Sequence, residues 1–389
     1  MNKLRILATS AVLAILVGCS NPQTQSTSPV QSPLPAATSA TPSGSTSLSE
    51  VDAKKAQALA TQVKDGVFPY AEQNKKENAK IFLFLASTSD NEQVVIAALD
   101  GMAKTWTGAA GNAQKEPINE DYRAALLKLL ESDSNRVLAN ALEAAKPALL
   151  GQTEVSALQE KLIGLADNHK EAGARLEALN ALSGFKDFQQ NEKIASVFLK
   201  NLDAPEAHLK SLALFRIQFN NYKLAHHDEF YAKAKSLMKD SNPGVRGRAA
   251  EVCSVLVPES EKQALGASIT EMLGDKEAYV RSASADALGR LGYKPAVPKL
   301  MLLLEDKSRN TYEIEYTRLN GLAGSEHHDG SAWSRVDDSI LWSLSQLTFE
   351  MGEQKFPYGK INWKNVDGDV AREVKLAKAW YEKNKNSLK

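Results

Sequence analysis

The sequence has few of the features that mark several common protein classes. Only two of its 389 residues are cysteines, and Cys253 lies in an apolar helical stretch, so we expect no disulfide framework. Its 47 Lys and Arg balance 47 Asp and Glu, so it has no general attraction to nucleic acid or anionic lipid. Nucleotide-binding Gly-rich loops, a Gly-x-Ser-x-Gly elbow and Cys-x-x-Cys are missing. The sequence therefore predicts neither an enzyme nor a cofactor.

Residues 1–18 have the anatomy of a secretory signal peptide. After a basic start, residues 6–17 form an apolar run that is shorter than the roughly 20 residues needed to span a bilayer. The segment that follows, Leu16-Val17-Gly18-Cys19, resembles the lipobox of bacterial lipoproteins. The resemblance implies that Cys19 becomes the first residue after cleavage and carries acyl chains such as palmitate, which anchor the protein to a membrane. An ordinary secretory signal next to a chance cysteine is the alternative.

The segment after Cys19 predicts a tether. Ser20 follows the cysteine, and the lipoprotein sorting rule for two-membrane envelopes then implies the outer membrane, facing the periplasm. Residues 20–48 contain no charged residue and are rich in Ser, Thr and Pro, so they cannot bury enough apolar area to fold. We therefore expect residues 19–48 to be a lipidated, disordered tether. The capping-box spacing of Ser47 and Glu50 predicts that the first helix begins there.

Residues 49–348 show helical spacing of apolar residues and an internal repeat. An Asp-centred turn followed by an Ala/Leu-rich stretch recurs at intervals of 43, 34, 36, 37 and 35 residues. One helical hairpin cannot cover its own apolar face, so neighbouring hairpins stack and share a core. The pattern predicts an all-α solenoid. The turn residues are Asp90, Asp133, Asp167, Asp203, Asp240 and Asp275.

Two of these units carry a recognisable motif. Asp240 to Arg246 and Asp275 to Arg281 share an Asp-x4-Val-Arg turn, which resembles the short HEAT repeats of bacterial proteins. The resemblance implies a HEAT/armadillo-like superhelix, in which the turn Asp and the Arg pair between repeats as a ladder. The units at Asp167 and Asp203 lack the Val-Arg pair. Tetratricopeptide repeats have a similar period, but their Trp/Leu-Gly/Tyr signature is missing from this sequence. The remaining alternative to HEAT repeats is therefore an α-solenoid of another class.

Two segments depart from the repeat. Residues 307–335 are an insert whose 311–317 segment alternates like a strand, so we expect a short hairpin or ordered loop that projects from one face. Insertions in solenoids often lie on the binding face, although a merely tolerated extension is the alternative. Residues 349–389 are rich in aromatic residues and predict a cap on the last repeat. Carbohydrate stacking on these aromatic rings is the second interpretation.

Two histidine clusters are weak candidates for metal ligands. His226 and His227 precede two acidic residues, and His327 and His328 precede Asp329. Imidazole and carboxylate groups bind transition metals, but adjacent histidines point in different directions in regular structure. Solvated turns are the alternative, and the sequence predicts no metal site.

These observations lead to a hypothesis of function. We expect a membrane-anchored scaffold in the bacterial cell envelope that binds a protein partner through its concave face, the insert, or both. A metal-dependent hydrolase built on the insert, and a passive structural or cell-wall contact protein, are the alternatives. The sequence leaves the partner and the oligomeric state open. For Arg246 and Arg281, pairing with turn Asp residues in the ladder is the alternative to a partner contact. Candidate partner contacts are Arg246, Arg248, Arg281, Arg290, Tyr312, Tyr316 and Trp333.

Overall fold

The computed structural model describes most of the repeat region. The described residues are 48–107, 114–149, 157–186, 188–218, 224–328, 335–349, 355–357, 359 and 366–388. The predicted signal peptide, Cys19 and nearly all of the tether lie outside these residues. Within them, no helix is both long and apolar enough to cross a membrane.

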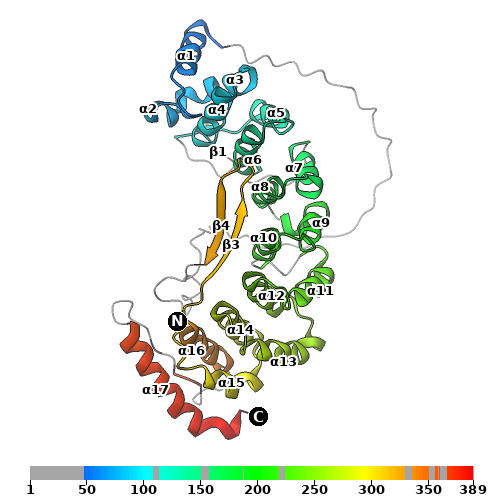
Figure 1. The fold of residues 1–389 in the computed structure, drawn as a ribbon, viewed down its shortest axis with the longest axis vertical. Helices are drawn as coiled ribbons and strands as arrows, with labels where there is room; N and C mark the ends of the chain where they lie inside the picture. Colours follow the sequence, from blue (N-terminus) through cyan, green and yellow to red (C-terminus); the bar gives the residue numbers. More distant parts are fainter. Residues whose placement is uncertain are drawn as a thin grey trace, which may run out of the picture. The chain divides into compact units, whose positions relative to one another are not determined.

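Helical hairpins stack in two rows (Figure 1). We call the first helix of each hairpin an A helix and the second a B helix. Within each hairpin the A helix packs on its B helix, and each B helix from α4 to α14 also packs on the next. The A helices are α3 (Ala79–Thr88), α5 (Glu120–Leu129), α7 (Ala157–Asn168), α9 (Glu192–Asn201), α11 (His227–Leu237), α13 (Lys262–Met272) and α15 (Val297–Leu302). The B helices are α4 (Glu92–Thr105), α6 (Asn135–Leu149), α8 (Ala172–Leu182), α10 (Ala207–Ile217), α12 (Pro243–Leu256), α14 (Ala278–Leu291) and α16 (Val336–Leu347).

Each of the six predicted Asp residues shortly precedes a B helix, from α4 to α14, although Asp167 is itself in the last turn of α7. This holds for the units at Asp167 and Asp203 as well, although they lack the Val-Arg pair. Ala and Leu side chains of both rows are buried in one continuous hydrophobic core, because small residues let helices approach and larger ones fill the seam. The prediction of an all-α solenoid is confirmed.

Side-chain caps decide where several of these helices begin. Asn242 Oδ1 accepts from the backbone N–H of Val245, and Pro243 occupies the first helical position. In α1 (Glu50–Ala60) the cap is Ser49, whose Oγ accepts from the backbone N–H of Asp52 at 3.1 Å. The prediction that Ser47 caps this helix is therefore wrong, because Ser49 and Asp52 offer the same spacing two residues later.

The remaining elements lie at the ends of the array and in the insert. The short helix α2 (Tyr70–Gln73) precedes α3, and β1 (Trp106–Thr107) pairs in parallel with β2 (Glu116–Pro117). After the repeats, α17 (Val366–Asn384) packs on α16. Phe356 and Trp380 are buried in the main core with ring centroids 5.9 Å apart, which is the packing that a cap makes.

The insert forms an antiparallel hairpin of β3 (Tyr312–Thr317) and β4 (Ala323–His328). Backbone hydrogen bonds close its base, from the N–H of Val336 to Ser308 O at 3.1 Å and from the N–H of Asp337 to Asp306 O at 3.0 Å. These bonds let the chain leave the solenoid after α15 and return at α16 without breaking the stack. The predicted hairpin is confirmed.

Candidate functional site

The hairpin lies along the B helices (Figure 1), and β3 packs on α10 and α12. Its burial alternates as the pleat requires: Tyr312 and Ile314 are buried, whereas Glu313, Glu315 and Thr317 are exposed. The expectation that the insert projects from the solenoid is thus wrong. Its apolar face finds a better environment against the helices than in water.

A polar network fixes β4 to α10 and α12. Glu326 Oε1 accepts three hydrogen bonds, from Ser211 Oγ at 2.7 Å, from Arg248 Nη2 at 2.8 Å and from Tyr312 Oη at 2.8 Å. Arg248 also donates to Tyr312 Oη through Nε at 3.1 Å. Burial raises the pKa of Tyr312, which keeps its hydroxyl protonated and able to donate. Because the acceptor is charged and shielded, each of these bonds is stronger than a neutral surface bond.

Aromatic contacts and one glycine also pack the hairpin against the B helices. The rings of Tyr279 and Tyr312 lie 4.3 Å apart, and those of His208 and Tyr316 lie 4.8 Å apart. A Cβ on Gly244 would lie 2.7 Å from the Tyr312 ring, so the glycine permits this close approach. The hairpin is held by its own small hydrophobic cluster as well as by the polar network.

Three predicted partner contacts are therefore engaged inside the chain. The side chain of Arg248 is 14% exposed and Tyr312 is 7% exposed, and Tyr316 is half-buried on His208. The role of partner contact does not fit Arg248 or Tyr312, because both are used to hold the hairpin. Sequence reasoning missed Ser211 and Glu326, since nothing local marks residues that meet across 115 positions.

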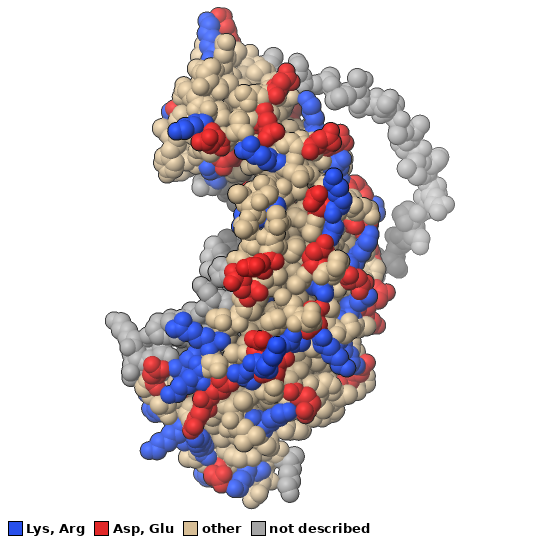
Figure 2. Space-filling model, in the orientation of Figure 1, with Lys and Arg blue, Asp and Glu red and all other residues tan. Residues whose placement is uncertain are grey.

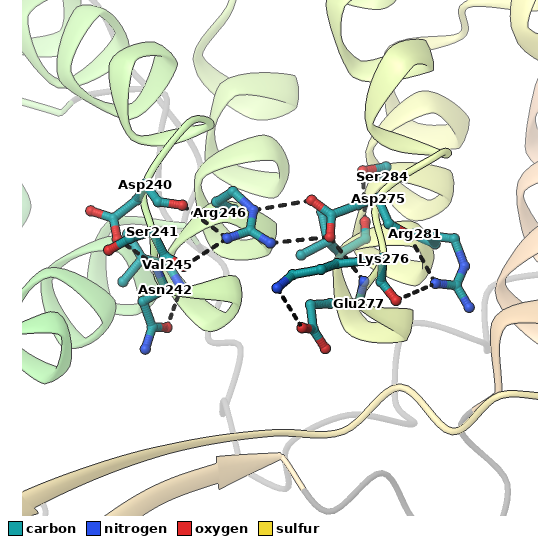
Figure 3. Close-up of polar contacts among 11 residues, drawn as sticks. Asp240, Ser241, Asn242, Val245, Arg246, Asp275, Lys276, Glu277, Arg281 and Ser284 are labelled. Carbon is teal, nitrogen blue, oxygen red and sulfur yellow. Dashed lines mark hydrogen bonds and ion pairs between the residues drawn. The ribbon is translucent and has the colours of Figure 1, made fainter.

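Arg246 and Arg281 form the ladder that the HEAT resemblance implied, and Figure 3 shows the contact between Arg246 and Asp275. Arg246 donates through Nε and Nη2 to the Asp275 carboxylate, at 3.1 and 3.0 Å, and through Nη1 to the carbonyl oxygens of Asp240 and Ser241. Arg281 binds Asp306 in the same way, with Nε at 2.8 Å. Each guanidinium thus ties its own turn to that of the next repeat.

The ladder extends further than the sequence motif. Arg175 Nη2 contacts both oxygens of Glu206 at 2.9 Å, and Lys210 Nζ lies 2.6 Å from Asp240 Oδ2. The shared signal is a basic residue at the fourth position of the B helix, which holds for Arg175 in α8, Lys210 in α10, Arg246 in α12 and Arg281 in α14. Searching for that position alone, without the preceding Val, finds all four.

The other predicted residues occupy less constrained places. The side chain of Arg290 is 36% exposed, with Nη2 3.8 Å from Glu251 Oε1 and its guanidinium over the ring of Trp342. It remains open to a partner. Trp333 lies outside the described residues.

His226 and His227 lie beside neighbouring carboxylates. His226 caps α11 in the left-handed conformation, φ +58°, and its ring nitrogens face Glu192 and Glu229 at 3.1 and 2.8 Å. His227 Nδ1 lies 3.1 Å from Asp228. Among the described residues no three His, Cys, Asp or Glu are grouped to hold a metal ion. His327 and His328 lie in β4, but their side chains, and Asp329 entirely, lie outside the description.

Comparison with known proteins supports the fold. A family model for HEAT repeats matches residues 231–314, so the chain contains HEAT repeats. No curated protein matches the chain. A chain from the structure of Kap95p bound to RanGDP superposes with a TM-score of 0.51 at 11% identity, over 84% of this chain and 45% of that one.

Two further solved structures match the chain with lower TM-scores. YibA of Escherichia coli matches with a TM-score of 0.46 at 15% identity, over 78% of this chain and 94% of its own. Kap121p matches with a TM-score of 0.39 at 13% identity, over 82% and 42%. This chain therefore spans less than half of the Kap95p-complex and Kap121p chains that it matches.

Proposed function

We propose that this protein is a lipid-anchored HEAT-repeat scaffold that binds a protein of the bacterial cell envelope. The lipobox-like residues 16–19 and the uncharged stretch 20–48 support the anchor and the tether. The stacked repeats support a binding role, because a solenoid presents a long lateral surface for its mass. The hairpin that lies on the B helices makes part of that surface a two-stranded sheet.

The observation that carries the proposal is the open edge of β4. Its sheet has two strands, and within the described residues β4 pairs only with β3. The other edge of β4 thus presents backbone N–H and C=O groups without a neighbouring strand, which is a template for an added strand. A partner segment in extended conformation would complete the sheet by main-chain hydrogen bonds.

Side chains around this edge define what such a segment needs. Glu313 and Glu315 are exposed on the outer face of the hairpin, and Leu322 at its tip is 63% exposed. Carboxylates favour basic side chains, and an exposed leucine favours an apolar contact. Acidic and basic side chains are interspersed over the side shown in Figure 2, so complementarity is local to the hairpin. The partner we infer offers an extended segment with basic and apolar residues.

Ser325→Pro tests this contact without dismantling the hairpin. The N–H of Arg318 donates to Leu322 O, and the alternation of an antiparallel ladder then directs the N–H of Ser325 to the outer edge. Proline removes that donor, whereas Ser325→Ala keeps it. In crosslinked envelopes we expect tagged wild-type and Ser325→Ala chains to capture the same protein, and Ser325→Pro to lose it. Equal capture by all three would exclude the β4 edge as the contact.

The anchor requires a separate test. Metabolic labelling with a palmitate analogue should mark the wild-type chain and leave Cys19→Ser unlabelled, and the variant should leave the membrane fraction. A labelled or membrane-bound Cys19→Ser chain would contradict lipidation at this residue.

A further inference from the structure

A polar pocket lies where the tip of the hairpin meets the B helices α6, α8 and α10. Its volume is about 430 Å³, within the range of roughly 300–1,000 Å³ that small-molecule sites occupy. Five charged side chains line it, two acidic and three basic. They are Glu143, Lys146, Glu177, Arg216 and Arg318.

None of these five side chains forms an ion pair within the described part of the chain, although they share one pocket. Arg216 Nη2 donates to Asn180 Oδ1 at 3.0 Å, but its buried Nε has no hydrogen-bond partner. Glu177 and Arg216 are half-buried, whereas Glu143, Lys146 and Arg318 are exposed. A half-buried charged group that lacks an ion-pair partner is costly. A ligand with complementary groups would remove this cost, which is how a preformed polar site gains affinity.

Charges of both signs act on one another around the pocket. Burial raises the pKa of Glu177, and the nearby Glu143 carboxylate raises it further. Burial lowers the pKa of Lys146, and the nearby Arg216 guanidinium lowers it further. Glu177 thus lies within reach of both the Glu143 carboxylate and the Lys146 ammonium, and Lys146 within reach of both Arg216 and Glu177.

The hairpin tip forms one wall. Arg318 and Asn320 line the pocket from the turn. The Oδ1 of Asn320 accepts from the N–H of Leu322 at 3.1 Å and so holds the turn in place. A Cβ on Gly173 in α8 would lie 2.6 Å from the backbone nitrogen of Leu319, so only glycine lets the tip approach this closely. A ligand in the pocket would touch the helices and the hairpin together.

We propose that this pocket binds a small zwitterion of the amino-acid or short-peptide class. Its carboxylate lies between Lys146 and Arg216, and its ammonium lies between Glu143 and Glu177. The bound ligand braces the hairpin tip against α6, α8 and α10. This inference does not depend on the envelope partner or on the lipid anchor.

Calorimetric titration of the full chain in detergent with glycine, Ala-Ala and Ala-Ala-Ala tests the proposal. At least one of these free zwitterions should bind, and N-acetyl-Ala-Ala and Ala-Ala-amide should bind about tenfold or more weakly, because each lacks one charged hydrogen bond. Glu177→Gln and Lys146→Met should weaken binding by a similar factor. Glu313→Gln removes an exposed carboxylate on the outer face of the hairpin and should leave binding unchanged.

A structural readout separates a bound ligand from a disturbed fold. The zwitterion that binds should slow tryptic cleavage after Arg318 in the wild type but not in Glu177→Gln, whose unfolding temperature should match that of Glu313→Gln. The proposal is overturned if no free zwitterion binds at millimolar concentration. Equal binding of the capped peptides, or equal weakening by Glu313→Gln, would overturn it too.

Discussion

Gly173, the second residue of α8, determines how closely the hairpin tip approaches the B helices. A Cβ on this residue would lie 2.6 Å from the backbone nitrogen of Leu319 and 3.0 Å from its Cα. Because these are backbone atoms, no side-chain rotation relieves the clash. We therefore expect Gly173→Ala to displace the turn at residues 318–322 from α8.

The magnitude follows from two opposing contributions. Leu319 is 5% exposed, and returning a buried leucine side chain to water costs about 1.5–3 kcal/mol. Replacing glycine by alanine within a helix contributes about 0.5–1 kcal/mol in the opposite direction. The net expectation is a loss of about 0.5–2.5 kcal/mol. Gly164→Ala in α7 is the matched control, because its Cβ would meet no atom within 4 Å, and it should stabilise the protein by about 0.5–1 kcal/mol.

Two measurements check this prediction. Urea unfolding gives the global change, and hydrogen exchange of β3 and β4 gives the local one, which matters because repeat arrays need not unfold in one step. Gly173→Ala should lose protection in the hairpin, whereas Gly164→Ala should keep it. If Gly173→Ala were as stable as Gly164→Ala and its hairpin equally protected, the close packing of the tip on α8 would be refuted.

Three further predictions address the ladder, the buried thiol and the half-buried carboxyl group of Asp286. Arg246→Met leaves the Asp275 carboxylate without its guanidinium and should lower the free energy of unfolding in urea by about 1.5–3 kcal/mol. Arg136→Met, which removes an exposed ion pair, should lower it by less than about 0.5 kcal/mol. Equal losses in the two variants would contradict the ladder. Cys253 is buried, and burial raises its pKa. In a Cys19→Ser chain, iodoacetamide should therefore modify Cys253 only after urea is added. Rapid modification of the folded protein would show that the thiol is accessible. Burial raises the pKa of Asp286 to about 7 from 3.8, so between these pH values the folded state binds one more proton and stability falls as pH rises. The stability of Asp286→Asn relative to wild type should therefore increase across this window and level off above it, and a constant difference in unfolding free energy between pH 4 and 8 would contradict the shift.

The location of the hairpin changes which residues are available to a partner. Glu326, Arg248 and Ser211 are engaged in holding β4, whereas the outer edge of β4 has no neighbouring strand within the described residues and Leu322 at the tip is exposed. A solenoid whose B-helix face carries a bound strand pair is already partly occupied by its own chain. The open edge therefore takes the place of the bare helical face as the surface we expect a partner to meet.

Local patterns in the sequence determined much of the fold. Helical spacing, Asp turns and caps such as Asn242 act over a few residues, and each B helix from α4 to α14 begins where a turn predicted it. The HEAT resemblance implied a ladder, and the structure pairs Arg246 with Asp275 and Arg281 with Asp306, one repeat apart. The alternation at residues 311–317 was enough to predict a hairpin, because the pleat imposes period two.

Only the tertiary structure decided where that hairpin lies and what it touches. Ser211 and Glu326 meet although 115 residues separate them, and Arg318 joins Lys146 and Glu177 in one pocket from three different elements. No spacing rule encodes such contacts, because they depend on the path of the whole array and on the room left by Gly173 and Gly244. The apolar face of β3 had to be buried somewhere, and the packing of α10 and α12 determined the place.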